Sequence, residues 1–402
     1  MNIHIGKGRA EGHIEAPPSK SMAHRMLICA AMCEEESTVR GISSCEDVLA
    51  TLDCMRALNI DFTRVGDDVT VHGAHPRNMK PTEPLRCRES GSTLRFMIPI
   101  AMMSGSRAVF HAASGLMARP MSVYETLFSE KALTYRSDGE SITVCGPLTS
   151  GDYTVAGNIS SQFISGLLFA LPCAEGDSLL HITPPIESRS YIELTREALA
   201  SFGVVTEWLD EHTLRIPGGQ RLRASDITVE GDYSNAAFTE ALNLFGGEVC
   251  VHGLREGSLQ GDRVYKKHFE LLSRGVPTIH IGDCPDLGPI LFAVAAAKCG
   301  GIFTGTKRLR IKESDRAAAM AEELTKFGAS VSVYEDTVVI YPADFHAPSE
   351  PLCGHNDHRI VMALSVLLTL TGGVIEGAEA VNKSYPAFFE HLSTLGIEVT
   401  PV

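Results

Sequence analysis

The chain has 402 residues, of which 44% are hydrophobic and 6% are aromatic, and its formal net charge is −14. This length exceeds what one hydrophobic core usually holds, so we expect two domains. The acidic balance disfavours nucleic acids and anionic membrane surfaces as partners. The longest apolar stretches, 290–297 and 360–370, are shorter than the roughly 20 residues that span a bilayer.

Eleven cysteines are scattered singly along the chain, with no Cys-x-x-Cys pair. An odd number without such a pair fits neither a disulfide framework nor a zinc site, and it indicates a reducing compartment. Residues 1–12 contain no long apolar run, so we expect no signal peptide and a cytoplasmic location. His355 and His358 have a metal-like spacing, and no third ligand is identified near them in the sequence. We therefore expect no metal and no cofactor.

Six polar clusters each open an apolar helix, and they recur along the whole chain. The openings are Lys20-Ser21, Gly91-Ser92-Thr93, Gln162, Gly231-Asp232, Asp286 and Asp357-His358-Arg359. From Lys20, Gly91, Gln162, Asp232, Asp286 and Asp357 the successive spacings are 71, 71, 70, 54 and 71 residues. A second helix start follows each opening, at Asp47, Arg119, Ser188, Asp262, Glu313 and Ser384. Such a period indicates one supersecondary unit used repeatedly.

Paired strands are expected after these second helices. The pairs, each around a short turn, are 61–63 with 69–71, 133–135 with 141–144, 204–206 with 213–216, and 331–334 with 337–340. The copy that begins at Asp286 predicts a buried helix over 287–298, a strand over 302–305 and an amphipathic helix over 313–327. Helices alternating with strands define an α/β class.

The short interval marks the fourth unit as different and divides the six units into three and three. The stiff segment Ala16-Pro17-Pro18 and the segment 227–231 are candidates for chain crossings. We expect two lobes joined by these crossings, with a cleft between them.

Basic residues gather at the predicted helix starts. They are Lys20, Arg25, Arg95, Arg119, Lys312, Arg316, Arg359 and Lys383. Helix N-termini bind anions through free backbone N–H groups and the helix dipole. Arg359 and Lys383 stand where that dipole disfavours a cation, which indicates an anionic ligand. Each group taken alone also fits a solvated surface position.

Serines and a glutamine open the third helix and its companion. Ser160-Ser161-Gln162 and Ser188-Arg189-Ser190-Tyr191 offer hydroxyl and amide groups to a phosphate or polyol, although serine is also a common helix cap. On the first helix, Lys20 and Arg25 are expected to share one face and to suit a phosphate or carboxylate.

Two carboxylates are candidates for acid–base chemistry. Lys312 and Arg316 are four residues apart and are expected to share a helix face, with Glu313 beside them as a possible proton relay. Asp286 precedes an apolar helix, where it is either an N-cap or a proton acceptor.

Seven motifs, taken together, resemble a known family. They are Pro18-Ser19-Lys20-Ser21 with His24-Arg25, Ala118-Arg119-Pro120, Ser160-Ser161-Gln162-Phe163, Pro285-Asp286, Lys312-Glu313-Ser314-Asp315-Arg316, Asn356-Asp357-His358-Arg359 and Lys383-Ser384-Tyr385-Pro386. In this order, over nearly all of the chain, they resemble the 5-enolpyruvylshikimate-3-phosphate synthase family of the enolpyruvyl transferase superfamily.

The resemblance implies a two-lobed α/β fold of the inside-out α/β barrel type, with six βαβαββ units, three per lobe. Residues 17–229 would form one lobe, and residues 1–16 with 230–402 a discontinuous second lobe, with the active site in the cleft. The implied reaction transfers the enolpyruvyl group of phosphoenolpyruvate to the 5-hydroxyl of shikimate 3-phosphate and releases phosphate, a step of aromatic amino acid biosynthesis. We expect a monomer that binds these small molecules and neither nucleic acid nor membrane.

The resemblance also assigns residues to roles. Shikimate 3-phosphate would meet Lys20, Ser21, Arg25, Ser160, Ser161, Gln162, Ser188, Tyr191, Asp286 and Lys312. Phosphoenolpyruvate would meet Lys20, Gly91, Arg119, Gln162, Arg316, Arg359 and Lys383. Asp286, Glu313 and Lys383 are the implied catalytic residues. The chain departs from the family pattern at Glu89-Ser90 and at Arg308.

Three alternatives differ in recognisable ways. The related enzyme that uses UDP-N-acetylglucosamine carries a cysteine before its Ala-Arg-Pro motif, whereas segment 111–117 of this chain has Ser114 and no cysteine. A non-catalytic binder of phosphorylated metabolites would need the cations but not Asp286 and Glu313. An enzyme that processes RNA ends fits poorly with the negative charge and the lack of a basic patch interleaved with aromatic residues.

Overall fold

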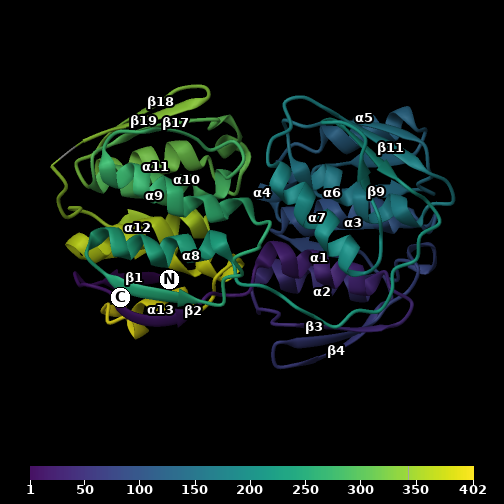
Figure 1. Cartoon of the computed structure of the whole chain (residues 1–402), viewed down its shortest axis with the longest axis horizontal. Coiled ribbons are helices and arrows are strands. Elements are labelled where there is room, and N and C mark those ends of the chain that lie inside the picture. The colour runs from purple at the N-terminus through teal and green to yellow at the C-terminus, as the bar shows by residue number, and fades with distance from the viewer. Residues whose placement is uncertain (343) are drawn as a thin grey trace. The chain divides into compact units, whose positions relative to one another are not determined.

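The computed structural model describes residues 1–342 and 344–402, and the chain forms two compact units (Figure 1). The central unit comprises Pro18–Glu230, and the discontinuous unit comprises Met1–Pro17 with Gly231–Val402. Each unit has a hydrophobic core of its own. The chain passes between the units twice, at Pro17–Pro18 and at Glu230–Gly231.

The central unit is built from helices and short strands in regular alternation. Its helices are α1 (Lys20–Ala31), α2 (Glu46–Ala57), α3 (Gly91–Met102), α4 (Ser114–Met117), α5 (Ser122–Glu130), α6 (Ser161–Ala170) and α7 (Arg189–Ser201). Its strands are β3 (Glu36–Arg40), β4 (Asp61–Val65), β5 (Asp68–His72), β6 (Leu85–Arg88), β7 (Arg107–Ala112), β8 (Thr134–Ser137), β9 (Ser141–Cys145), β10 (Asp152–Ala156), β11 (Ser178–Thr183), β12 (Glu207–Trp208), β13 (Thr213–Ile216) and β14 (Ile227–Thr228).

The discontinuous unit uses the same kinds of element. Its helices are α8 (Tyr233–Glu240), α9 (Tyr265–Arg274), α10 (Gly288–Ala297), α11 (Arg316–Thr325), α12 (His358–Thr371) and α13 (Phe388–Thr394). Its strands are β1 (Asn2–Ile5), β2 (Glu11–Glu15), β15 (Glu248–His252), β16 (Thr278–His280), β17 (Gly301–Thr304), β18 (Ser330–Val333), β19 (Thr337–Tyr341), β20 (Leu352–Cys353), β21 (Gly373–Glu376) and β22 (Val399–Pro401).

Five sheets repeat one topology. Their strand orders are β14-β3-β5-β4, β6-β7-β9-β8, β10-β11-β13-β12, β16-β17-β19-β18 and β20-β21-β1-β22. In each sheet the first pair is parallel and the next two pairs are antiparallel. In the last four of these sheets one helix, α3, α6, α10 or α12, connects the parallel pair, as such a crossover requires. In the first sheet the parallel strands β3 and β14 come from opposite ends of the central unit's sequence. The predicted α/β class with six repeated units is therefore confirmed.

The sixth sheet explains the short interval in the sequence. It consists of β2 and β15 in parallel, and among the described residues it has no antiparallel hairpin beyond them. The unit that begins at Asp232 thus keeps its helix and its parallel pair but lacks the hairpin of the other five. The 54-residue spacing, 17 residues below the 71 seen elsewhere, is the length of chain that such a hairpin with its turn would need.

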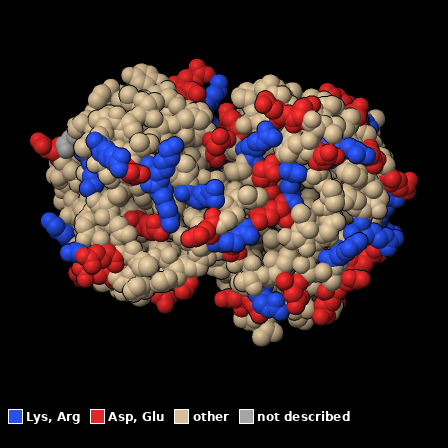
Figure 2. Space-filling view, viewed as in Figure 1, with Lys and Arg blue, Asp and Glu red and all other residues tan. Residues whose placement is uncertain are grey.

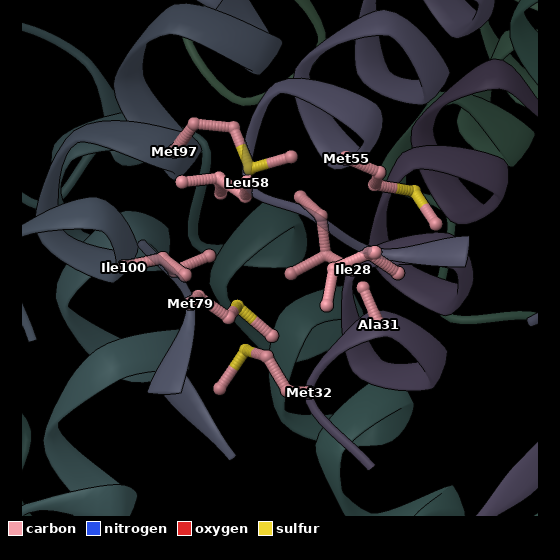
Figure 3. A pocket seen from close by; sticks show the side chains of 9 residues that line it. Ile28, Ala31, Met32, Met55, Leu58, Met79, Met97 and Ile100 are labelled. Carbon is pink, nitrogen blue, oxygen red and sulfur yellow. The ribbon is translucent and has the colours of Figure 1, made fainter. Parts of the chain in front are cut away.

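The apolar stripes of the helices form the cores. Helix α10 is buried along almost its entire length, as its continuous apolar sequence predicts, and so is α12. The core of the central unit contains a small apolar pocket near α1, α2 and α3, into which several methionines project (Figure 3). Met32, Met55, Met79 and Met97 line it, and their flexible thioethers suit such an irregular gap.

Several boundaries differ from the sequence-based expectation. The strand predicted at 204–206 is wrong, because the partner of β13 is β12, over Glu207–Trp208. The helix predicted from Glu313 begins at Arg316, where Asp315 caps it through the N–H of Ala318. The second helix start predicted at Arg119 lies instead between α4 and α5. The other three predicted strand pairs are confirmed.

Helices α3 and α6 approach so closely that Gly166 has no room for a side chain. A Cβ on this residue would overlap the Tyr124 hydroxyl and the carbonyl oxygen of Arg95, which are joined by a 2.7 Å hydrogen bond. We predict that Gly166→Ala lowers the free energy of unfolding by about 1–3 kcal/mol, the usual cost of overpacking a core. Gly115→Ala is the matched control, because a Cβ there would have no atom within 4 Å. Equal stability of the two variants in urea denaturation would contradict the packing argument.

Candidate active site

Serine caps shape three helix starts in the central unit. Ser19, Ser90 and Ser160 are the N-caps of α1, α3 and α6, and their hydroxyls accept hydrogen bonds from the N–H groups of Met22, Thr93 and Gln162. Each cap satisfies one of the first four N–H groups of its helix, which have no partner within the helix. The other N–H groups and the positive end of the helix dipole lie at the same start. We group residues of these starts and of α7, together with Arg119 from the segment between α4 and α5, as the serine half-site. Its members are Lys20, Ser21, Gly91, Arg119, Ser160, Ser161, Gln162, Ser188 and Tyr191.

Gln162 connects two helix starts within this half-site. Its amide nitrogen donates to the hydroxyl of Ser92 at 2.9 Å, and its amide oxygen accepts from Arg95 at 2.6 Å. Gly91 lies beside the same arginine, since a Cβ on it would be 3.0 Å from a guanidinium nitrogen of Arg95 and 3.4 Å from one of Arg119. The structure therefore brings Gly91, Arg119 and Gln162 together, as expected, around Arg95.

Lys20 forms an ion pair with Asp47. The distance from its Nζ to the Asp47 carboxylate is 3.0 Å, and both side chains are only 13% exposed. Asp47 lies in the first turn of α2, where the helix dipole favours a carboxylate. The ammonium is thus fixed at the start of α1 beside Ser21.

Arg25 is buried, and its hydrogen bonds go to α7 and to the first turn of its own helix. Its guanidinium donates to the hydroxyl of Thr195 at 2.9 Å and to the carbonyl oxygens of Tyr191 at 3.0 Å and Ser21 at 2.7 Å. Burial lowers the pKa of Arg25 to about 10, so it is still charged at neutral pH. Lys20 and Arg25 have separate partners, Asp47 for the lysine and α7 together with Ser21 for the arginine.

The remaining serine half-site residues come from α6 and α7. Ser160 caps α6, and Ser161 is buried in its first turn. Ser188 is the N-cap of α7 with a left-handed backbone, φ 57°, which is uncommon for a residue with a side chain. Tyr191, held through its carbonyl by Arg25, lies in the first turn of α7.

A buried hydrogen-bond chain lies behind these helix starts. His24 Nδ1 and the Thr51 hydroxyl are 2.7 Å apart, the hydroxyls of Thr51 and Thr93 are 2.8 Å apart, and Thr93 reaches the Ser90 hydroxyl at 2.8 Å. The chain connects α1, α2 and α3 through side chains alone. Burial, together with the charges of Lys20 and Arg25, holds the pKa of His24 well below 6.5, so this histidine is neutral.

The discontinuous unit contains a second group of polar residues around Asp286. We call it the aspartate half-site: Asp286, Lys312, Glu313, Arg316, Asp357, Arg359 and Lys383. The Asp286 carboxylate lies 2.8 Å from Arg316, 3.0 Å from Arg359 and 3.4 Å from Lys312. The N-cap of α10 is Leu287, which makes no side-chain cap bond. The alternative of Asp286 as a simple N-cap is therefore wrong, because its oxygens bind cations.

Arg316 is the most enclosed cation of the aspartate half-site. Its side chain is 1% exposed and contacts three carboxylates: Asp286 at 2.8 Å, Glu313 at 2.6 Å and Asp357 at 2.8 Å. Burial lowers the pKa of Arg316, but the three carboxylates outweigh burial and raise it above its ordinary value.

Asp357 connects this arginine to α12. It is fully buried, caps the helix by accepting from the N–H of Arg359, and accepts a further bond from the Ser314 hydroxyl at 3.1 Å. The cap places Arg359 in the first turn, where its guanidinium donates to Ser234 at 2.6 Å and to Asp286. The carboxylates of Asp286 and Asp357 thus offset the repulsion between the Arg359 side chain and the positive end of the α12 dipole, which was noted from the sequence.

Lys312 lies outside any helix, contrary to expectation. It follows the 3₁₀ turn Lys307–Ile311 with an extended backbone, whereas Arg316 begins α11, so the two share no helix face. Both still reach Asp286. Burial lowers the pKa of Lys312, with Asp286 opposing and the charges of Arg308 and Arg316 reinforcing this shift.

Lys383 is half-buried at the end of the 3₁₀ segment Ala378–Lys383. Its Nζ donates to the carbonyl oxygen of Asn356 at 2.6 Å. Asn356 and the preceding His355 both have positive φ, 50° and 48°, which is a strained backbone immediately before α12. The hydrogen bond ties Lys383 to the helix start that carries Arg359.

Sequence reasoning missed partners that turn out to organise both half-sites. Asp47 and Asp357 hold Lys20 and Arg316, Arg95 holds Gln162, and Ser234 holds Arg359. Asp47, Arg95 and Asp357 stood at recognised helix starts, and that position was the signal by which they could have been found. Nothing in the sequence paired Asp47 with Lys20.

Charges on the visible surface of each unit are mixed. On the face shown in Figure 2, basic and acidic side chains are interspersed over each unit, without a continuous basic surface. Every helix within residues 1–342 and 344–402 is too short or too polar to cross a bilayer.

Comparison with known proteins identifies the family. The profile of EPSP synthase (3-phosphoshikimate 1-carboxyvinyltransferase) matches residues 5–392. The chain is 36% identical to the 3-phosphoshikimate 1-carboxyvinyltransferase of Clostridium kluyveri, with 99% of this chain and 98% of that protein aligned. It is 38% identical to the protein of that name from Clostridium acetobutylicum, with 97% and 96% aligned. The chain therefore belongs to the EPSP synthase family.

The fold agrees with this assignment. A solved structure of EPSP synthase from Acinetobacter baumannii superposes with a TM-score of 0.80 at 24% identity, and the match covers 100% of both chains.

We predict that His24 makes stability depend on pH. Because its folded-state pKa lies below the unfolded value of 6.5, the unfolded chain binds a proton first, and stability falls as the pH drops below 6.5. His24→Asn keeps a group that can bond Thr51 but has no proton to gain. Between about pH 8 and pH 5, urea denaturation should show the wild type losing stability relative to this variant. Parallel stability profiles for the two proteins would exclude this role of His24.

Proposed function

We propose that the protein transfers the enolpyruvyl group of phosphoenolpyruvate to the 5-hydroxyl of shikimate 3-phosphate, and that the serine and aspartate half-sites act together on this pair of substrates. Family membership over nearly the whole chain supports the reaction. The observation that carries the site assignment is Asp286, a carboxylate surrounded by Lys312, Arg316 and Arg359.

The charges of the substrates match those of the half-sites. The two substrates together bring two phosphates and two carboxylates. In the proposed assignment, shikimate 3-phosphate binds to Lys20, Ser21, Arg25, Ser160, Ser161, Gln162, Ser188, Tyr191, Asp286 and Lys312. Phosphoenolpyruvate binds to Lys20, Gly91, Arg119, Gln162, Arg316, Arg359 and Lys383. Arginine and lysine at helix starts suit these anions.

Arg25 has a positioning role in this proposal. Its donors go to Ser21, Tyr191 and Thr195, so it fixes two proposed shikimate-side residues relative to each other. Arg95 acts similarly toward Gln162. The sequence placed Arg95 among the basic residues at helix starts, but it did not assign Arg95 to either substrate.

The reaction requires two proton transfers at carbon. In the addition, the 5-hydroxyl oxygen bonds to C2 of phosphoenolpyruvate, the hydroxyl loses its proton and C3 gains one. In the elimination, the bond from C2 to the phosphate oxygen breaks, C3 loses a proton and the double bond re-forms. We assign the hydroxyl proton to Asp286, and the C3 proton and leaving phosphate to Glu313 and Lys383. Such groups each contribute roughly 10²–10⁴-fold.

The Asp286 environment is suited to this role. Its carboxylate is 20% exposed, so a substrate hydroxyl has access to it. The surrounding cations hold it in place, and orientation of this kind lowers the barrier to reaction. Glu313 is similarly oriented by its 2.6 Å contact with Arg316.

The activity is tested by phosphate release. We predict that purified protein releases phosphate when both substrates are present, and not with either one alone, because the phosphate leaves only after the 5-hydroxyl has added. UDP-N-acetylglucosamine should not replace shikimate 3-phosphate. Tight binding of both substrates without phosphate release would favour the non-catalytic binder instead.

The role of Asp286 is tested by Asp286→Asn. The amide keeps the shape of the side chain but accepts no proton, so we predict that kcat falls by a factor of about 10² or more. Calorimetry should still show binding of shikimate 3-phosphate, and thermal unfolding should confirm a folded protein.

Asp315→Asn is the matched control. Asp315 is an exposed N-cap of α11, close in sequence to Glu313 and Arg316, and asparagine caps a helix about as well as aspartate. Its kcat should be near that of the wild type. An Asp286→Asn protein with a near wild-type kcat would remove Asp286 from the mechanism.

A further inference from the structure

The two-stranded sheet of β2 and β15 displays an unusual set of side chains on its outer face. Along both strands residues alternate, so that Ile14 and Val249 are buried while His13, Cys250 and His252 are exposed. In the register of this parallel pair, His13 lies directly opposite Cys250. His252, two residues beyond Cys250 on β15, points to the same face.

The donor atoms of these three residues already lie close together. His13 Nδ1 and His252 Nε2 are 3.0 Å apart, with the rings stacked at a centroid distance of 5.2 Å and an interplanar angle of 12°. The Cys250 sulfur and one nitrogen of each histidine all lie within 4.8 Å of one another. With Zn–N bonds of about 2.0–2.1 Å, a tetrahedral site separates two nitrogens by about 3.3 Å. The observed separation is within a few tenths of an ångström of this value.

We propose that His13, Cys250 and His252 bind one zinc ion, with water as the fourth ligand. Two imidazoles and one thiolate form a donor set that zinc accepts in tetrahedral geometry. On binding, the Cys250 thiol gives its proton to solvent and the histidines bind as neutral rings. The sequence offered no sign of this site, because His13 and His252 are 239 residues apart.

At this position on the β2–β15 sheet, a zinc ion would stabilise the structure. This is the sheet that lacks the antiparallel hairpin, and a pair of strands alone is marginally stable. The ends of β2 and β15 also adjoin both chain crossings: the N–H of Ala16 donates to His252 O at 2.9 Å, and that of Gly231 to Gly253 O at 3.2 Å. Zinc would connect β2 to β15 in the sheet where the hairpin is missing.

A second group of potential ligands has a different explanation. Glu322, Glu323 and His355 also lie close together. The buried Glu323 carboxylate, however, already contacts Lys326 at 3.1 Å, the N–H of Cys353 at 2.9 Å and His355 at 3.1 Å. These contacts account for the cluster without a metal.

The proposal is tested with the full chain, reduced and freed of metal by chelation. Titration against a chromophoric chelator should show one zinc ion bound per chain, and Co²⁺ in its place should give a thiolate-to-cobalt charge-transfer band. His13→Ala and Cys250→Ser should each weaken zinc binding at least tenfold, since even changes outside the ligand shell cost about 10–100-fold. At the same zinc concentration, zinc should raise the Tm of the wild type more than that of Cys250→Ser.

Exposed residues elsewhere supply the controls. Cys299→Ser and His212→Ala should bind zinc as the wild type does, because both residues are exposed and neither belongs to the cluster of three ligand atoms. Metal-free unfolding should show that His13→Ala and Cys250→Ser are folded. Zinc binding as weak in the wild type as in Cys250→Ser, or a cobalt complex without the thiolate band, would overturn the proposal.

Discussion

The buried guanidinium of Arg316 is the constraint on which the aspartate half-site depends. A charge removed from water is tolerated only when it is paired and hydrogen-bonded. Arg316 satisfies this condition with Asp286, Glu313 and Asp357, which come from three different segments of the discontinuous unit. The same interactions fix the start of α11, the cap of α12 and the orientation of Asp286. Loss of this arginine would leave three carboxylates close together without their shared cation.

The repeated unit explains why polar residues gather in this way. Each repeat begins a helix after a strand of the parallel pair, and the cap of that helix is a serine or aspartate in α1, α3, α6, α8 and α12. Buried carboxylates also hold basic side chains at helix starts, as Asp47 holds Lys20 of α1 and Asp357 holds Arg316 of α11. The fourth repeat departs from this pattern by losing its hairpin, and there a cluster of histidines and a cysteine lies on the exposed face of the sheet.

The sequence predicted the positions of helices and strands better than it predicted the contacts between side chains. Periodicity located the starts of α1, α3 and α12, because apolar runs after polar clusters are local signals. It misplaced the start of α11, since the polar residues before Arg316 resemble a first helical turn although Lys312 is extended. The partners of Arg25 on α7 were beyond prediction, because Thr195 is 170 residues away and only the packing of the two helices brings it near. Long-range pairs of this kind leave no local pattern.

The central claim is an addition followed by an elimination, in which C3 of phosphoenolpyruvate first gains and then loses a proton. Acidic groups of the protein exchange with solvent, so in D₂O the proton delivered to C3 is a deuteron. The transient methyl group then loses one of its three hydrogens. Mass spectrometry of the product formed in D₂O should therefore show deuterium in the enolpyruvyl methylene, accompanying phosphate release. Complete turnover in D₂O with an undeuterated methylene would contradict the account.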